Sequence, residues 1–104
     1  MRIEVRARDF SVTEAISSYA TERVRLSLSR FRPRVTRVTV RLANDQGPRG
    51  SLEKRCVVEL RLTHLEPIAV SAVEASGYEA IDSAMQKAER AASRRLARAS
   101  RLVS

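Results

Sequence analysis

The fold is decided largely by residues 76–101, SGYEAIDSAMQKAERAASRRLARASR, which form the clearest pattern in the chain. At roughly 100° per residue, the apolar residues fall on one arc of a helix, and five basic residues fall within an arc of about 80° nearly opposite. This predicts an amphipathic helix that packs inward with one face and presents positive charge with the other. Ser76 followed by Glu79 predicts a capping box at its start. The apolar arc contains Ile81, Met85, Ala88, Ala92, Leu96 and Ala99, and the basic arc contains Lys87, Arg90, Arg94, Arg98 and Arg101.

Two stretches before this helix alternate apolar and polar residues, which is typical of half-buried strands. They cover about residues 55–62 and 68–72, and the short turn at 64–67 predicts an antiparallel hairpin. The only cysteine, Cys56, cannot form an internal disulfide, and its apolar position in the first of these strands predicts a buried structural thiol.

The first part of the chain predicts a strand, a helix and a second strand. Residues 2–8 alternate with arginine at most outward positions, and residues 37–42 alternate in the same way. Between these stretches, apolar residues recur every three or four positions, which predicts a helix over about residues 12–31. We expect Pro33 to end this helix, because proline disfavours helical backbone in the residue before it.

Local signals also mark the element boundaries. Ser11 followed by Glu14 forms a possible capping box for the first helix, and Thr13 is a competing N-cap. The stretch ANDQGPRGS at 43–51 contains two of the three glycines and one of the prolines. This composition predicts a loop between the second and third strands.

Together these elements predict the order β-α-β-β-β-α in one domain, residues 1–104. The helix between the first two strands is long enough for a crossover, so those strands can be parallel neighbours. The expected fold is an α/β (α+β) two-layer sandwich, with a four-stranded sheet and both helices on one face. The other face of the sheet would be rich in arginine, since outward positions hold Arg2, Arg6, Arg8, Arg37, Arg41, Arg55 and Arg61.

The charge balance predicts a polyanionic partner. Lysine and arginine number 20 against 12 acidic residues, a net charge of +8 over 104 residues, which favours nucleic acid or another anionic surface. Arginine can bind phosphate in a bidentate way, although a GC-rich genome also raises arginine content. No apolar run has the length of a membrane span, and the first ten residues lack a hydrophobic signal core, so we expect a cytoplasmic protein without a membrane partner.

Catalysis is not indicated. His64 lies near Glu59 and Glu66 in sequence, but a lone histidine at a hairpin turn is usually an exposed polar residue. The sequence contains no glycine-rich phosphate loop and no metal-ligand cluster. We therefore expect no enzyme activity, small-molecule substrate, cofactor or bound metal.

The order of the expected elements, with VTEAI at 12–16 and YEAID at 78–82, resembles the short ribosome hibernation-promoting factors. This sigma-54 modulation family includes the ribosome-associated translation inhibitors, and the resemblance covers nearly the whole chain. It implies a factor of stress and stationary phase that binds the small ribosomal subunit on 16S ribosomal RNA. The implied site is the channel between head and body, where the factor would inhibit translation by blocking messenger and transfer RNA.

The resemblance also implies which residues bind RNA. The basic series of the last helix matches the family's basic positions, and Arg23 matches a basic position on the first helix. Beyond Arg23 the register shifts by about one residue, so Arg25 and Arg30 are weaker matches. The expected RNA-binding residues are Lys87, Arg90, Arg94, Arg98, Arg101, Arg23, Arg25 and Arg30.

Three features differ from the family pattern. Leu96 stands where relatives often have a basic residue, Ala88 and Ala92 stand where they have larger apolar residues, and the third strand is longer. The chain ends at Ser104, so we expect it to lack the C-terminal dimerisation domain of long relatives. The expectation is a protein that is monomeric when free and does not pair ribosomes by itself.

Two other functions remain open from the residues alone. A double-stranded-RNA-binding module has the order α-β-β-β-α, which lies inside the order expected here, although the extra first strand argues against it. Alternatively, the basic helix could dock an acidic protein as a regulator. The aromatic residues Phe10, Tyr19, Phe31 and Tyr78 lie outside the expected strand interiors, so we expect recognition of shape and phosphate rather than base stacking.

Overall fold

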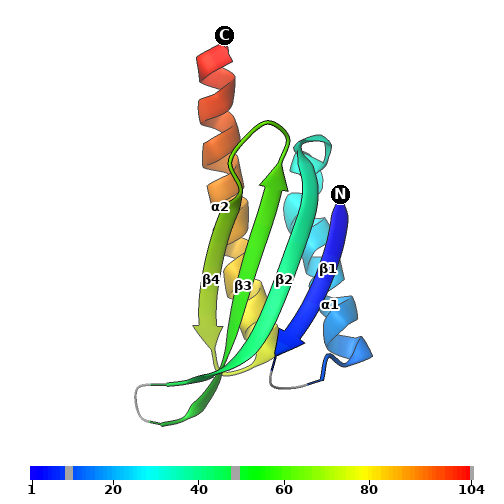
Figure 1. Cartoon of the computed structure of the whole chain (residues 1–104), viewed down its shortest axis with the longest axis vertical. Helices are drawn as coiled ribbons and strands as arrows, with labels where there is room; N and C mark the ends of the chain where they lie inside the picture. Colours follow the sequence, from blue (N-terminus) through cyan, green and yellow to red (C-terminus); the bar gives the residue numbers. More distant parts are fainter. Residues whose placement is uncertain (9–10, 48–49, 104) are drawn as a thin grey trace.

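The computed structural model describes residues 1–8, 11–47 and 50–103, so Phe10, Ser104 and the centre of the expected 43–51 loop lie outside the described residues. The elements follow the predicted order β-α-β-β-β-α, with one additional 3-10 helix, η1 (Figure 1). They are β1 (Arg2–Arg8), α1 (Glu14–Leu28), η1 (Ser29–Arg34), β2 (Val35–Gln46), β3 (Leu52–Leu62), β4 (Ile68–Glu74) and α2 (Gly77–Val103).

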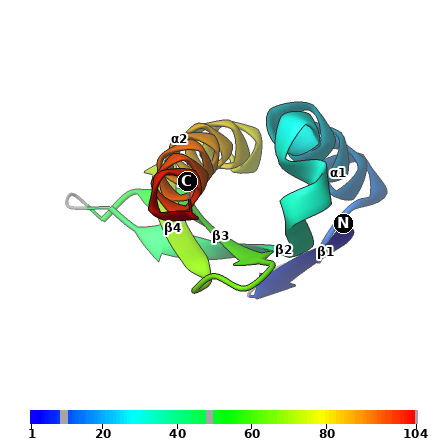
Figure 2. The same cartoon turned by 90° about the horizontal axis from the view of Figure 1, so that it is seen from above.

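The four strands form one sheet in the order β1-β2-β3-β4. β1 runs parallel to β2, while β2 with β3 and β3 with β4 are antiparallel. β1 and β2 are parallel because α1 carries the chain back to the edge of the sheet at which β1 begins, so that β2 starts there and runs in the same direction. Both helices cover the same face of this sheet (Figure 2), which confirms the predicted two-layer sandwich.

The core lies between the sheet and the helices. The apolar residues that alternate along the strands face inward, as the registers of Val40 with Val5 and Val58 show. Opposite them, α2 contributes mostly small side chains, which bring its backbone close to the sheet because packed layers leave few voids. The fully buried residues of α2 are Ala80, Ile81, Ala84, Met85, Ala88 and Ala92.

The first helix differs from its prediction at both ends. The α-helix ends at Leu28, earlier than predicted. The chain continues as η1, and Pro33 lies inside this 3-10 helix rather than after the end of a helix. Pro33 has no backbone N–H to donate, so it cannot extend the α-helical hydrogen-bond ladder, and the segment forms a short 3-10 helix instead. At the start, the Thr13 hydroxyl accepts a hydrogen bond from the Ile16 amide at 3.2 Å, so Thr13 rather than Ser11 is the N-cap.

The predicted loop at 43–51 is wrong in its first four residues, 43–46, which belong to β2. β2 continues through Gln46, and β3 already begins opposite it at Leu52. Cross-strand contacts extend the hairpin, because Asp45 accepts a hydrogen bond from Arg55 at 2.7 Å and Asn44 accepts one from Lys54. Polar residues therefore pair here as strand residues, which a composition rule for loops does not anticipate.

The start of α2 agrees with its prediction. The Ser76 hydroxyl accepts a hydrogen bond from the Glu79 amide at 3.2 Å, and the helix begins at Gly77. Gly77 is tightly packed, since a Cβ atom built on it would lie 2.7 Å from the Ile16 side chain. Glycine therefore allows the first turn of α2 to pack against α1.

Candidate nucleic-acid interface

The basic stripe of α2 faces solvent from Lys87 to Arg101. Its five residues, Lys87, Arg90, Arg94, Arg98 and Arg101, are all exposed, because the opposite arc of the helix is buried against the sheet. The helix contains 27 residues, which at 1.5 Å per residue gives a rod about 40 Å long. Its last turns extend past the end of the sheet (Figure 1). The stripe is therefore accessible both on the body of the protein and on this projection.

Within the described part of the chain, Arg90, Arg94 and Arg98 form no hydrogen bond or ion pair. Lys87 differs from them, because its Nζ donates a hydrogen bond to the Ser71 carbonyl oxygen of β4 at 2.8 Å. Arginines without acidic partners keep all their donors available for phosphate. The centre of the stripe is therefore the part of α2 that is best prepared to bind an anion.

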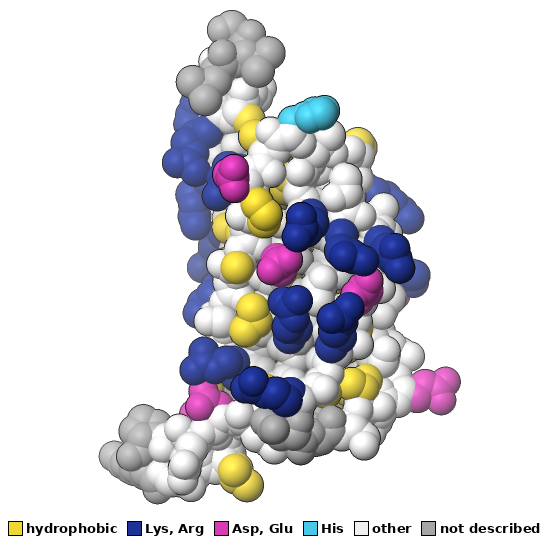
Figure 3. All heavy atoms as spheres, in the orientation of Figure 1, with side chains coloured by type: hydrophobic (Ala, Val, Ile, Leu, Met, Phe, Trp, Pro, Cys, Tyr) yellow, Lys and Arg dark blue, Asp and Glu magenta, His cyan; other side chains and the backbone are white. Residues whose placement is uncertain are grey.

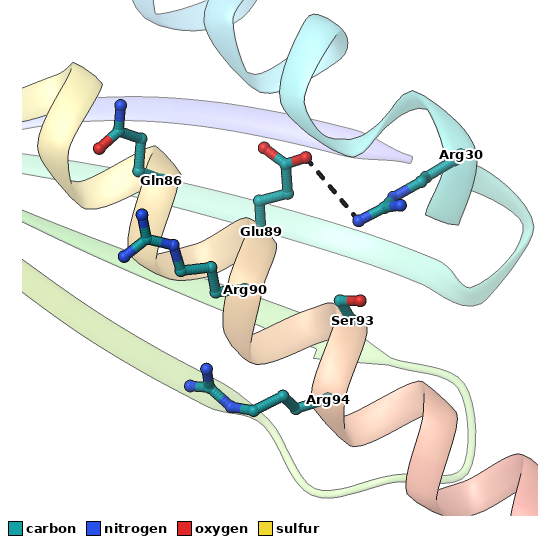
Figure 4. Close-up of a pocket in the computed structure, with 6 residues that line it drawn as sticks. All are labelled: Arg30, Gln86, Glu89, Arg90, Ser93 and Arg94. Carbon is teal, nitrogen blue, oxygen red and sulfur yellow. Dashed lines mark ion pairs between the residues drawn. The ribbon is translucent and has the colours of Figure 1, made fainter.

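A hollow of about 390 Å³ lies between η1 and α2, and Arg30 lies at its edge. The Arg30 guanidinium is 3.8 Å from the Glu89 carboxylate and 4.6 Å from the centre of the Phe31 ring. Figure 4 shows Arg30 and Glu89 facing each other, with Arg90 and Arg94 along the other side of α2. The structure thus brings Arg30 beside the stripe. The lining residues are Arg30, Gln86, Glu89, Arg90, Ser93 and Arg94.

A second hollow of about 270 Å³ continues along α2 toward its C-terminal end. It is lined by Arg94, Ala97, Arg98 and Arg101, so Arg94 belongs to both hollows. Because the two hollows share Arg94, they form one continuous basic surface, and Lys87 extends it by one turn, three residues before Arg90. We call Arg30, Lys87, Arg90, Arg94, Arg98 and Arg101 the helix surface.

Arg23 is placed beside the helix surface but is already paired. Its Nε lies 3.0 Å from the Asp82 carboxylate of α2, which also accepts a hydrogen bond from the Tyr19 hydroxyl at 2.6 Å. That hydrogen bond raises the pKa of Tyr19, and partial burial of the phenol adds to the effect. The Tyr19 ring also lies 5.0 Å from the Tyr78 ring. Arg23 therefore helps to hold α1 against α2.

Arg25 lies away from the helix surface. It follows Arg23 by two residues, which on an α-helix is a rotation of about 200°. Since Arg23 contacts α2, the exposed Arg25 points to the opposite side of α1. Three predicted RNA-binding residues come from α1 and η1. The structure brings Arg30 into the helix surface, places Arg23 next to it and separates Arg25 from it.

Sequence reasoning did not identify three polar residues near this surface. Gln86 and Ser93 line the first hollow, and their spacing of four and three residues from Arg90 is the signal that could have found them. Arg95 donates a hydrogen bond to the Glu66 carbonyl oxygen at 2.8 Å, which ties α2 to the turn between β3 and β4. That contact depends on the tertiary fold and has no local signal.

The uncovered sheet face forms a second basic surface, as the outward arginines predicted. We call Arg2, Arg6, Arg8, Arg37, Arg41, Arg55 and Arg61 the sheet surface. Figure 3 shows acidic side chains between basic ones over the strands. Glu4 contacts Arg6 and Arg37 at 2.8 Å each and Arg2 at 3.7 Å. Partial burial would raise the pKa of Glu4, but Arg37, Arg6 and Arg2 outweigh it and hold that pKa below its ordinary value.

Cys56 is buried, as predicted, and burial raises the pKa of its thiol to about 12. A thiol with this pKa is almost entirely protonated at neutral pH and is a poor nucleophile. Within residues 1–8, 11–47 and 50–103, no group of three or more His, Cys, Asp or Glu residues could hold a metal ion. No helix in these ranges is long and apolar enough to span a membrane.

Comparisons with known proteins agree with this geometry. The model of the family described as sigma 54 modulation protein / S30EA ribosomal protein matches residues 3–100. A ribosomal subunit interface protein from Coxiella burnetii has a similar structure, with a TM-score of 0.78 and 17% identity over 93% of this chain and 99% of that chain. The N-terminal domain of Protein Y from Thermus thermophilus has a TM-score of 0.73 and 23% identity over 90% and 98%. No curated protein sequence matches the chain.

Proposed function

Since the chain belongs to the sigma 54 modulation protein / S30EA ribosomal protein family, whose model matches residues 3–100, we propose that it is a cytoplasmic ribosome hibernation factor. In this proposal it binds 16S ribosomal RNA of the small subunit in the decoding channel. Translation is inhibited because the bound protein occupies the sites of messenger and transfer RNA. Family membership agrees with the resemblance carried by VTEAI at 12–16 and YEAID at 78–82.

The observation that carries this proposal is the run of unpaired arginines on the helix surface. Arg90, Arg94 and Arg98 have no acidic partner among the described residues, so binding phosphate would break no existing contact of theirs. Arg30 adds a cation from a distant part of the chain, beside the same hollow. Guanidinium groups bind phosphate oxygens in a bidentate way, which suits a folded RNA with a dense phosphate surface.

The proposed inhibition needs only occupancy. A helix of 27 residues that projects beyond its sheet can enter an RNA-lined channel while the sandwich fills the space behind it. Each phosphate that is neutralised releases condensed counterions, so affinity should fall steeply with salt. With five to seven contacts, we expect a slope of log affinity against log salt of about −4 to −6 by duplex-DNA scaling.

The test is co-sedimentation of the purified protein with purified small ribosomal subunits over a salt series. An excess of initiator transfer RNA and messenger serves as the competitor. We expect saturable one-to-one binding that the competitor displaces. Binding that does not saturate would contradict the proposal and indicate a general polyanion binder. Saturable binding that the competitor leaves unchanged would contradict the decoding-channel site.

The fold itself argues against the double-stranded-RNA-binding alternative. That module lacks a strand equivalent to β1, whereas here β1 pairs with β2 along its whole length, from Arg2 opposite Arg37 to Arg8 opposite Ala43. A regulator that docks an acidic protein would not bind naked ribosomal subunits tightly. The same co-sedimentation experiment therefore separates that alternative from the proposed function.

A further inference from the structure

The sheet surface places like charges directly opposite each other. Arg2 is the register partner of Arg37, and Arg37 is the register partner of Arg61, so three strands carry arginine in one row. In a second row, Arg6 lies opposite Arg41. Like charges at directly opposite positions destabilise a sheet. A solvated surface does not require this arrangement, because threonine or glutamine would be equally soluble there.

The acidic residues of this face compensate the arginines only in part. Glu4 and Glu59 lie in the row between the two arginine rows, each aligned with Thr39. Glu59 is 3.8 Å from Arg41 and 4.0 Å from Arg61. At these distances the contacts of Glu59 are weak, solvent-exposed ion pairs. Glu4 and Asp45 pair more closely, at 2.8 Å from Arg6 and 2.7 Å from Arg55, so phosphate would compete with these two acids. The face retains a positive charge because the arginines outnumber the acids.

One end of the face contains a hollow of about 310 Å³ between four arginines. Arg6 and Arg41 lie in one row, and Arg8 and Arg55 lie in the next, on either side of Ala43. Ala43 and Val57 form a small apolar floor between them. We call Arg6, Arg8, Arg41 and Arg55 the arginine square. Strands lie about 4.8 Å apart, so guanidinium groups from neighbouring strands can reach the same phosphate.

We propose that the arginine square is a second RNA-binding site, which takes the phosphate backbone of an RNA strand. The choice of RNA as the polyanion rests on the proposed function. The square lies on the face of the sheet opposite to the helices (Figure 2). The protein would therefore lie between two RNA segments, one on the helix surface and one on the sheet surface. The floor of Ala43 and Val57 offers no aromatic ring for stacking, so this site recognises phosphate and not base identity.

The test uses a fluorescently labelled single-stranded oligouridine RNA, whose binding is followed by anisotropy over a salt series. All variants carry Arg90→Glu and Arg94→Glu, so that the helix surface does not mask the second site. To this background we add Arg41→Gln with Arg55→Gln. The matched control is Arg32→Gln with Arg34→Gln, which removes the same charge from exposed residues of η1 that line none of the three hollows.

The background protein should still bind the RNA in a salt-dependent way. Arg41→Gln with Arg55→Gln should reduce the slope of log affinity against log salt by about 1.4, because single strands contribute about 0.7 for each phosphate contact. The control pair should leave the slope unchanged. An equal change in both pairs, or no change in either, would overturn the proposal. Circular dichroism and thermal unfolding verify that each variant is folded.

This experiment contains no ribosome, so its failure is distinct from failure of the proposed function. If wild-type protein binds small subunits but the arginine square does not affect RNA binding, only the second site is wrong. If the square binds RNA but the protein does not bind small subunits, the hibernation function is wrong and the second site remains.

Discussion

The helix surface and the sheet surface are both rich in arginine, but their arginines have different partners. On α2, Arg90, Arg94 and Arg98 contact no acidic residue among those described. On the sheet, Arg6 and Arg37 each lie 2.8 Å from Glu4. Neighbours on a helix surface are three or four residues apart in sequence, whereas neighbours on a sheet come from different strands. The central arginines of α2 therefore stay without acidic partners, while β1, β2 and β3 bring acids between the sheet arginines.

This difference predicts a hierarchy of binding. Phosphate can bind Arg90, Arg94 and Arg98 without displacing a partner among the described residues, so their full attraction contributes to affinity. On the sheet surface, phosphate must compete with Glu4, Glu59 and Asp45 for the guanidinium donors. We therefore expect the helix surface to dominate binding of small ribosomal subunits and the sheet surface to add a smaller contribution.

The largest effect is expected for Arg90→Glu with Arg94→Glu. This change should abolish binding of small subunits at physiological salt, because it removes two phosphate contacts and adds two repulsive charges. Co-sedimentation measures the binding. Arg32→Glu with Arg34→Glu has the same total charge and should bind nearly as well as wild type. Unchanged binding of the Arg90 and Arg94 variant would show that the helix surface is not the main site.

Ala88→Leu should destabilise the contact between α2 and the sheet without changing any charge on either surface. Ala88 is fully buried between α2 and the sheet, and overpacking a filled core costs about 1–3 kcal/mol of folding free energy. Urea unfolding measures this loss. Ala97→Leu is the matched control, because Ala97 is exposed on the same helix. An equal effect of both substitutions would mean that the close approach of α2 does not limit stability.

Asp82→Asn should loosen the contact between the two helices. It weakens the hydrogen bond from Tyr19 and removes the ion pair to Arg23, at an expected loss of about 1 kcal/mol. Asp82 raises the pKa of Tyr19 above the ordinary value of 10.0, so the substitution should lower that pKa. Ultraviolet titration in a Tyr78→Phe background measures Tyr19 alone. Glu79→Gln, which removes an exposed acid of the same helix end, should leave the titration unchanged.

The sign of the pH dependence follows from this raised pKa. A phenol that is harder to ionise in the folded protein stabilises the fold below its unfolded pKa, near 10. That contribution is lost as the pH rises through the higher pKa of folded Tyr19. Wild type should therefore lose its stability advantage over Asp82→Asn in this alkaline range, which urea unfolding at several pH values would detect. An advantage that grows with rising pH would contradict the assignment.

The smallest effect is expected for Arg41→Gln. Its ion pair to Glu59 is long, at 3.8 Å, and exposed, while its register partner is the like-charged Arg6. We expect the free energy of unfolding to change by no more than about 0.5 kcal/mol in either direction. Thermal unfolding measures it. A loss above about 1 kcal/mol would show a structural role for Arg41 and weaken the case that it is present for binding.

Local patterns predicted most of the fold but misplaced two boundaries. The alternation around Val58 and the helical spacing around Ala88 depend on burial of one face, so they survive in the folded protein. The stretch 43–46 was expected to be a loop, but Asp45 and Asn44 pair with Arg55 and Lys54 across the hairpin. Such pairing depends on which strand lies opposite, and composition cannot show that.

The residues of the candidate site also fall into two groups, those that local spacing placed and those that only tertiary contacts placed. Helical spacing alone assembled Lys87, Arg90, Arg94, Arg98 and Arg101 on one side of α2. The three earlier basic residues, in contrast, were separated by tertiary contacts. Arg30 lies beside Glu89, Arg23 is paired with Asp82, and Arg25 faces away.

The sequence by itself determined the order of elements, the inward face of each strand and the basic stripe of α2. These depend on periodicity along one segment, which the chain carries before it folds. Only the tertiary structure decided which cations keep free donors and which are paired. Charges from α1, η1 and the strands meet only after packing, and at contact distances their pairing depends on side-chain position. The sequence therefore determines where the arginines occur, and the tertiary structure determines which of them keep free hydrogen-bond donors.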